Sequence, residues 1–190
     1  MRNFLAELEK VISESELKRL RNSIVFKEEE LLYLEDRPEV GKTVFVENAN
    51  EKCFKIENKN LKEILLWSID GGFLGKYDKF SEELTRRCDC VFGFVNYLAF
   101  IEFKTSATSE NFRKIKDNRN NAVEQLEHTL DYLEKVFKMK LTEKFKNHSF
   151  EAFICTPPHY PRQDTHFQRL SVRFLETYNI ELFEKNEKIC

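Results

Sequence analysis

The order of sequence patterns predicts an α/β protein in which helices flank a mixed β-sheet. From residue 60 onward, segments with helical spacing of apolar residues alternate with short apolar segments that are typical of strands. Glycine and proline are scarce, with 5 and 4 copies, so most of the chain is expected in regular elements. The length of 190 residues and the 41% hydrophobic content suit one domain, residues 1–190, with a single core.

Residues 1–57 are expected to be an N-terminal elaboration of this core. Regularly spaced apolar residues predict a helix over 3–21. The acidic segment 28–39 is expected to form a surface turn or a short helix. Residues 42–57 contain two β-rich stretches around a polar turn, which predicts a β-hairpin.

Residues 58–190 are expected to form the core itself. In chain order its predicted elements are a helix (60–69), three strands (72–77, 88–96 and 98–104), a helix (121–138), a strand (150–156), a helix (164–178) and a strand (180–183). The second and third strands are expected to form a hairpin with its turn at Asn96-Tyr97. The helix over 121–138 has the clearest periodicity, with apolar residues three and four positions apart.

Three charged residues interrupt the least polar long stretch of the chain, residues 88–104: they are Asp89, Glu102 and Lys104. Side chains alternate across a strand, so Glu102 and Lys104 share a face, and the predicted turn pairs residue 89 with about residue 104. Two neighbouring carboxylates repel each other, and a divalent cation such as Mg²⁺ resolves that repulsion. The pattern favours either a metal site that activates water or a structural salt bridge, and spacing alone leaves both open.

These residues resemble the signature of the PD-(D/E)xK nuclease superfamily. That signature is an acid on one strand and an acid-x-lysine on the next, within the α-β-β-β-α-β core of the restriction endonuclease-like fold. The resemblance covers roughly half of the chain, and Cys88 stands where the signature has proline. It implies that Asp89, Glu102 and the main-chain carbonyl of Phe103 hold Mg²⁺ or Mn²⁺, with Lys104 as the catalytic lysine.

The same resemblance implies two further catalytic residues. Many members carry a glutamate on the helix before the first strand, and Glu63 matches this place, with Glu82 and Glu83 as competing candidates. Some branches carry a glutamine early in the next helix, where Gln125 stands. An ordinary polar position on a helix is the alternative interpretation of Gln125.

Basic residues before and after the predicted site are candidates for contacts with nucleic-acid phosphates. They are Arg86, Arg87, Arg113, Lys114, Lys116 and Arg119. For each residue, a solvated surface position is the alternative. The net charge of −2 argues against a protein whose whole surface binds nucleic acid, so only a local basic patch is expected.

We expect a metal-dependent nuclease that hydrolyses phosphodiester bonds, in DNA rather than RNA, in a defence or repair role. The alternatives are a catalytically inactive nuclease-fold module that binds nucleic acid or a partner protein, and a purely structural domain. A homodimer or a partner protein is expected to supply specificity. The sequence shows no apolar signal or membrane segment and no disulfide framework among its five cysteines, which predicts a cytoplasmic protein.

Overall fold

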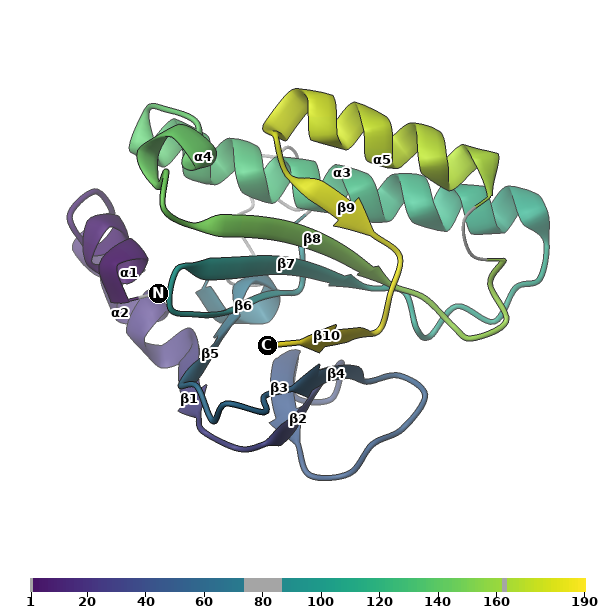
Figure 1. Cartoon of the computed structure of the whole chain (residues 1–190), viewed down its shortest axis with the longest axis horizontal. Helices are drawn as coiled ribbons and strands as arrows, with labels where there is room; N and C mark the ends of the chain where they lie inside the picture. Colours follow the sequence, from purple (N-terminus) through teal and green to yellow (C-terminus); the bar gives the residue numbers. More distant parts are fainter. Residues whose placement is uncertain (1, 74–86, 162–163) are drawn as a thin grey trace.

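The computed structural model describes residues 2–73, 87–161 and 164–190. A six-stranded sheet and a four-stranded sheet pack against each other through one apolar cluster, and helices cover the other face of the larger sheet (Figure 1). The larger sheet contains both parallel and antiparallel pairs. The predicted α/β class with a mixed sheet flanked by helices is confirmed.

The large sheet has the strand order β1-β5-β6-β7-β8-β9. Its strands are β1 (Ile24–Lys27), β5 (Ile64–Ser68), β6 (Cys90–Phe94), β7 (Tyr97–Phe103), β8 (Ser149–Cys155) and β9 (Glu181–Phe183). Neighbours from β1 to β7 are antiparallel, whereas β8 is parallel to both β7 and β9. The strands predicted over 88–96, 98–104, 150–156 and 180–183 are confirmed as β6, β7, β8 and β9.

The helix predicted over 60–69 is wrong, because residues 64–68 form β5 in the interior of the large sheet. All five side chains of β5 are buried, since one face packs against helices and the other against the small sheet. Periodicity cannot distinguish such a run from a buried helix. The described part of the strand predicted over 72–77 belongs to a π-helical turn, η1 (Ile69–Phe73), and the remainder lies outside the described residues.

The small sheet has the strand order β10-β4-β2-β3. Its strands are β2 (Leu31–Arg37), β3 (Lys42–Val46), β4 (Phe54–Glu57) and β10 (Glu187–Ile189). The turn or helix predicted over 28–39 is wrong, because β2 buries Leu32 and Leu34 between the sheets. The hairpin predicted over 42–57 is also wrong: β3 and β4 each pair with β2 instead of with each other.

Segments from residues 1–57 and from residues 58–190 share both sheets. In the large sheet, β1 pairs with β5, and in the small sheet the C-terminal β10 pairs with β4. Two helices, α1 (Arg2–Glu9) and α2 (Glu14–Ser23), stand in place of the single helix predicted over 3–21. Ser13 and Glu16 form a capping box, which starts a new helix at this point.

Two long helices, α3 (Phe112–Phe137) and α5 (Thr165–Tyr178), lie over one face of the large sheet (Figure 1). They confirm the helices predicted over 121–138 and 164–178, although α3 begins earlier because Asn111 caps it. A short helix, α4 (Leu141–Lys144), leads from α3 into β8. Among the described residues, no helix has both the length and the apolar character needed to cross a membrane.

Candidate metal and phosphodiester site

The turn between β6 and β7 determines which residues meet at the other end of these strands. Phe94 pairs with Tyr97 across a two-residue turn in which Asn96 has a φ of 57°, a conformation that asparagine tolerates. Extending this register by one residue beyond Cys90 and Ile101 places residue 89 opposite residue 102. The predicted pairing of residue 89 with residue 104 is therefore wrong by two positions, because the turn lies one residue earlier, at residues 95–96 instead of Asn96-Tyr97.

Asp89 lies directly before β6, and its carboxylate is tied to the neighbouring strand. Only 8% of the residue is exposed. Its Oδ2 accepts a hydrogen bond of 2.6 Å from the main-chain N–H of Phe103, the residue between the other two charged positions. Asp89 is thereby held beside Glu102, as predicted from the alternation of side chains along the strands.

Glu102 is almost fully buried, with 1% of the residue exposed, and it has one strong partner. The ammonium of Lys104 donates to Glu102 Oε1 at 2.6 Å. The other oxygen, Oε2, is also buried, and no N–H or O–H group of the described residues hydrogen-bonds to it. The Asp89 carboxyl lies within hydrogen-bonding reach of Glu102 but can donate only when it is protonated. A buried carboxylate oxygen without a donor is the kind of atom that a cation satisfies.

Helix α3 holds both the lysine and the segment that leads to Asp89. The side chain of Gln125 accepts a hydrogen bond of 2.7 Å from Lys104 and donates one of 3.0 Å to the carbonyl of Arg87. One turn later, Thr129 accepts a 2.9 Å hydrogen bond from the main-chain N–H of Cys88. Gln125 therefore contacts the site, as the resemblance implies. Sequence reasoning missed Thr129, whose signal was its position four residues after Gln125 on the same helix face.

The small sheet reaches the same end of the molecule, and its Asp36 is a third acid near the site. The main-chain N–H groups of Ile69 and Asp70 in η1 donate to the carbonyl of Asp89 at 3.0 and 3.3 Å. At Gly71, where φ is 65°, a Cβ would lie 1.6 Å from the carbonyl oxygen of Gly41, so η1 packs tightly on the turn between β2 and β3. Asp36, near the end of β2, was not predicted as a site residue, because segment 28–39 was not interpreted as a strand.

The electrostatics of the site favour neutral carboxyl groups when no cation is present. Burial raises the pKa of Glu102 to about 7, although the positive charge of Lys104 opposes this shift. Burial also raises the pKa of Asp89 well above its ordinary value, and the charge of Glu102 raises it further. The charge of Asp36 acts in the same direction on both groups. Paired acids with raised pKa values in one place are typical of functional sites.

The chemistry of the donor set fits Mg²⁺ or Mn²⁺. Mg²⁺ commonly takes one or two protein carboxylates and completes its shell with waters and substrate phosphate oxygens. Asp89 and Glu102 supply two carboxylates, and the buried Oε2 of Glu102 receives no hydrogen bond from the described residues when Asp89 is ionised. The described residues contain no group of three or more His, Cys, Asp and Glu side chains placed to hold a metal ion. Beyond these carboxylates and the main-chain carbonyl of Phe103, which the resemblance implies, a cation here would depend on waters and substrate for its remaining ligands.

Glu63 is not brought to the site. It directly precedes β5, whose pairing of Leu65 with Gly93 places this strand end near the β6–β7 turn, opposite the end that carries Asp89. Its carboxylate instead pairs with Arg2 at 2.7 Å. The prediction of Glu63 as a catalytic residue is wrong because the helix on which it relied is a strand. The competing candidates Glu82 and Glu83 lie outside the described residues.

Arg119 does not contact solvent, so its prediction as a phosphate contact is wrong. Its side chain is fully buried between α3, the start of α5 and the end of β9. It forms an ion pair with Asp164, donates to Glu184 at 2.8 and 3.0 Å, and donates to the carbonyl of Pro161 at 2.6 Å. Arg119 therefore joins the C-terminal segments to α3 and has a structural role.

The other predicted basic contacts differ in exposure. Arg113 and Lys114 are exposed in the first turn of α3, and Lys116 is half-buried with its ammonium 4.4 Å from the ring centre of Phe112. Arg87 is 9% exposed and lies over the ring of Tyr132 at 5.2 Å, so it is not a surface contact. Arg86 lies outside the described residues. The accessible candidates in the described chain are therefore those at the start of α3.

Comparisons of the chain with family models, with curated proteins and with solved structures found no match. The functional interpretation accordingly rests on the geometry and chemistry of the site.

The stability of the metal-free protein is expected to fall as the pH rises from about 5 to about 8. The folded state holds a proton on Glu102 up to about pH 7, whereas the unfolded chain releases it near the ordinary value of 4.5. The stabilisation is therefore complete below the unfolded pKa and is lost as the pH passes through the folded pKa, with a change on the order of 3 kcal/mol. Urea unfolding in EDTA at several pH values measures this change. Glu102→Gln removes one of the two carboxyl groups with a raised pKa and should make the profile shallower, while Asp89 still titrates. Equal slopes for both proteins would contradict the assignment.

Proposed function

We propose that this protein is a metal-dependent nuclease of the PD-(D/E)xK type that hydrolyses phosphodiester bonds in DNA. The observation that carries the proposal is the meeting of Asp89, Glu102 and Lys104 at one strand end, with a buried Glu102 oxygen that receives no hydrogen bond from the described residues when Asp89 is ionised. Gln125 on α3 supports it, because the resemblance implies a glutamine on this helix and Gln125 contacts Lys104.

The chain order of the elements around the site supports the restriction endonuclease-like assignment. Antiparallel β5, β6 and β7 follow one another in the sheet, and α3 then crosses to β8, which lies parallel to β7. This gives the β-β-β-α-β part of the proposed core. Asp89 directly precedes the second strand and Glu102 lies in the third, close to the places that the signature gives to the two acids.

In the proposed reaction a water oxygen attacks phosphorus, the P–O bond to the leaving oxygen breaks, and that oxygen takes up a proton. Asp89, Glu102 and the carbonyl of Phe103 would hold Mg²⁺ or Mn²⁺, which lowers the pKa of water and neutralises charge on the phosphate. Lys104 uses two of its three N–H donors on Glu102 and Gln125. Its remaining donor can orient the attacking water or stabilise the charge that develops on the phosphate oxygens. Gln125 and Glu102 fix the lysine for this role.

A cleavage assay tests the proposal. Purified protein is incubated with single-stranded DNA, double-stranded DNA and RNA, in Mg²⁺, in Mn²⁺ and in EDTA. We expect cleavage of at least one DNA substrate with Mg²⁺ or Mn²⁺ and none in EDTA. Cleavage that persists in EDTA would contradict the proposal, as would a complete absence of cleavage in both metals. In the second case, binding without cleavage would favour the non-catalytic module.

A further inference from the structure

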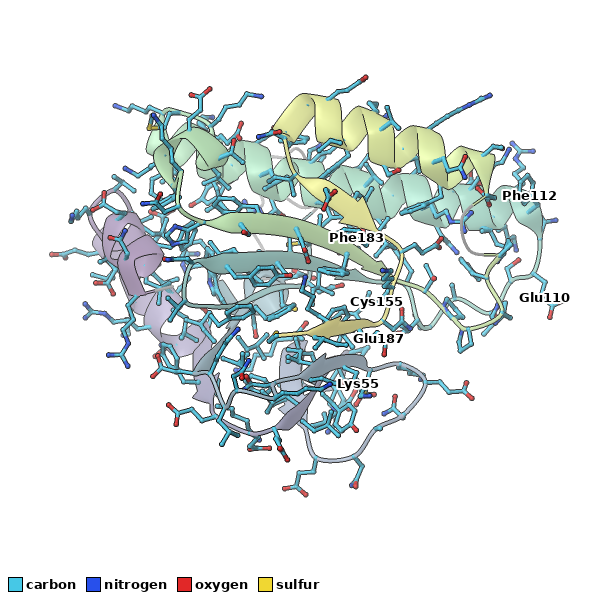
Figure 2. The ribbon with its side chains drawn as sticks, viewed as in Figure 1. Lys55, Glu110, Phe112, Cys155, Phe183 and Glu187 are labelled. Atoms are coloured by element: carbon cyan, nitrogen blue, oxygen red, sulfur yellow. The ribbon has the colours of Figure 1, made fainter. Side chains whose placement is uncertain are left out.

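A groove of about 410 Å³ opens beside Lys104, between the loop that follows β7 and the first turns of α3. Its walls include Lys104 and Thr108 from the loop side and Lys114, Asp117 and Asn118 from α3. Figure 2 shows Glu110 and Phe112 where this loop enters α3, at the edge of the molecule. The volume lies within the range of small-ligand pockets, and Lys104 belongs both to the groove and to the proposed catalytic site.

The charges that line the groove suit one phosphodiester group. Lys104 and Lys114 contribute two positive charges and Asp117 one negative charge, so the lining ionisable groups sum to one positive charge. Lys104 is largely engaged by Glu102 and Gln125. No ion pair or side-chain hydrogen bond of Lys114 is found in the described parts of the chain. Lys114 is therefore the cation that a ligand in this groove would meet first.

Neutral groups of the groove can complete the contacts to an anion. Ser106 and Thr108 are exposed and line the groove from the loop, and their hydroxyl groups are hydrogen-bond donors that suit phosphate oxygens. The amide of Asn118 donates to the hydroxyl of Tyr160 at 2.7 Å, which fixes this part of the wall. A wall that is held in place before the ligand arrives lowers the entropic cost of binding.

We propose that this groove is a phosphate subsite that holds the substrate phosphate next to the scissile bond, with Lys114 as its principal cation. The inference rests on the proposed nuclease function, because Lys104 links the groove to the reacting phosphate. On one side of the scissile bond, the substrate would then lie against the loop at 104–109 and the start of α3.

Replacing Lys114 tests the subsite, and Lys135 on the same helix supplies a matched control. Both lysines are exposed, but Lys135 lies in the last turn of α3 and only Lys114 lines the groove. We expect Lys114→Ala to weaken the binding of a labelled DNA oligonucleotide in Ca²⁺ by roughly threefold to tenfold, and to reduce the slope of log K against log salt by about 1. Lys135→Ala should change binding by less than about twofold. Equal effects of the two variants, or no effect of Lys114→Ala, would overturn the subsite.

A second comparison shows whether the groove binds an internal phosphodiester or a terminal phosphate. Oligonucleotides with and without a 5′-terminal phosphate are bound by the wild-type protein and by Lys114→Ala. The same loss for both oligonucleotides would identify an internal phosphodiester, and a loss confined to the phosphorylated one would identify a terminal phosphate. Either result supports a phosphate subsite, whereas a loss confined to the oligonucleotide without the 5′-phosphate would contradict it.

Different results would contradict the proposed subsite and the proposed nuclease function. If the wild-type protein cleaves DNA and Lys114→Ala cleaves and binds equally well, the subsite is wrong and the nuclease function stands. If the wild-type protein never cleaves but Lys114→Ala still weakens binding selectively, the groove binds phosphate and the nuclease function is wrong.

Discussion

Replacing Lys104 with alanine is expected to slow metal-dependent cleavage by at least about 100-fold, the usual cost of removing a donor that stabilises the charge of a transition state. The loss should appear in the rate of a single turnover with saturating enzyme, because the interaction is made during the reaction rather than in the binding of substrate. DNA binding in Ca²⁺ should change little by comparison. A Lys104→Ala rate within about threefold of the wild-type rate would remove the lysine from the mechanism.

The stability of this variant must be measured separately, because Lys104 also pairs with a buried carboxyl group at 2.6 Å. Lys104→Arg is the second variant, since arginine keeps the positive charge beside Glu102 but presents a different arrangement of donors. We expect Lys104→Arg to retain the wild-type melting temperature within a few degrees while losing most of the activity. Full activity in Lys104→Arg would show that charge alone suffices and that the position of the ammonium is unimportant.

Replacing Arg119 with alanine is expected to lower the free energy of unfolding by about 3–5 kcal/mol. The buried guanidinium joins Glu184, which is 7% exposed, to Asp164 at the N-terminal cap of α5, and the variant would leave both acids without their shared cation. Urea unfolding measures the loss. A decrease smaller than about 1 kcal/mol would show that the network does not hold the C-terminal segments.

Arg173 provides the matched control for this measurement. It forms an ion pair of 2.8 Å with Glu127, but 55% of its side chain is exposed. Exposed ion pairs contribute little to stability, so Arg173→Ala should lower the free energy of unfolding by less than about 1 kcal/mol. Replacing Arg119 and Glu184 together with apolar residues should recover part of the stability, because the buried charges are then removed from both partners.

The elements that the sequence could predict are those bounded by a clear turn or capping residue. Turn residues bound the apolar runs of β6, β7 and β8, and α5 carries a helical pattern behind the cap Asp164. β5 was assigned to a helix, because its short buried run carries no period that distinguishes a strand from a buried helix. β2 was not predicted as a strand because its segment is acidic, although its alternate leucines face the large sheet.

The pairing of the strands was harder to predict from the sequence than the strands themselves. β3 and β4 follow each other in the chain, yet β2 lies between them, and no local turn signal encodes this order. The edge strand β10 is three residues long and pairs with β4 from the distant N-terminal region. Such long-range pairing depends on the packing of the two sheets, which the sequence pattern does not specify.

Within the site, the alternation of side chains sufficed to bring Asp89, Glu102 and Lys104 together, and helix position sufficed for Gln125. The prediction of Glu63 failed because its supposed helix is a strand. The prediction of Arg119 failed because its charge is satisfied by partners 45 and 65 residues away, which no local pattern reveals.

The proposed function requires that Asp89 and Glu102 hold a divalent cation rather than only balancing each other and Lys104. Calorimetric titration of Mn²⁺ into the wild-type protein and into Glu102→Gln, at pH 8, above the pKa of about 7 of Glu102, is a direct test. We predict saturable binding by the wild-type protein and affinity reduced by at least about tenfold in Glu102→Gln. The same affinity in both proteins, or no saturable binding by the wild-type protein, would contradict the claim and leave a buried salt bridge in its place.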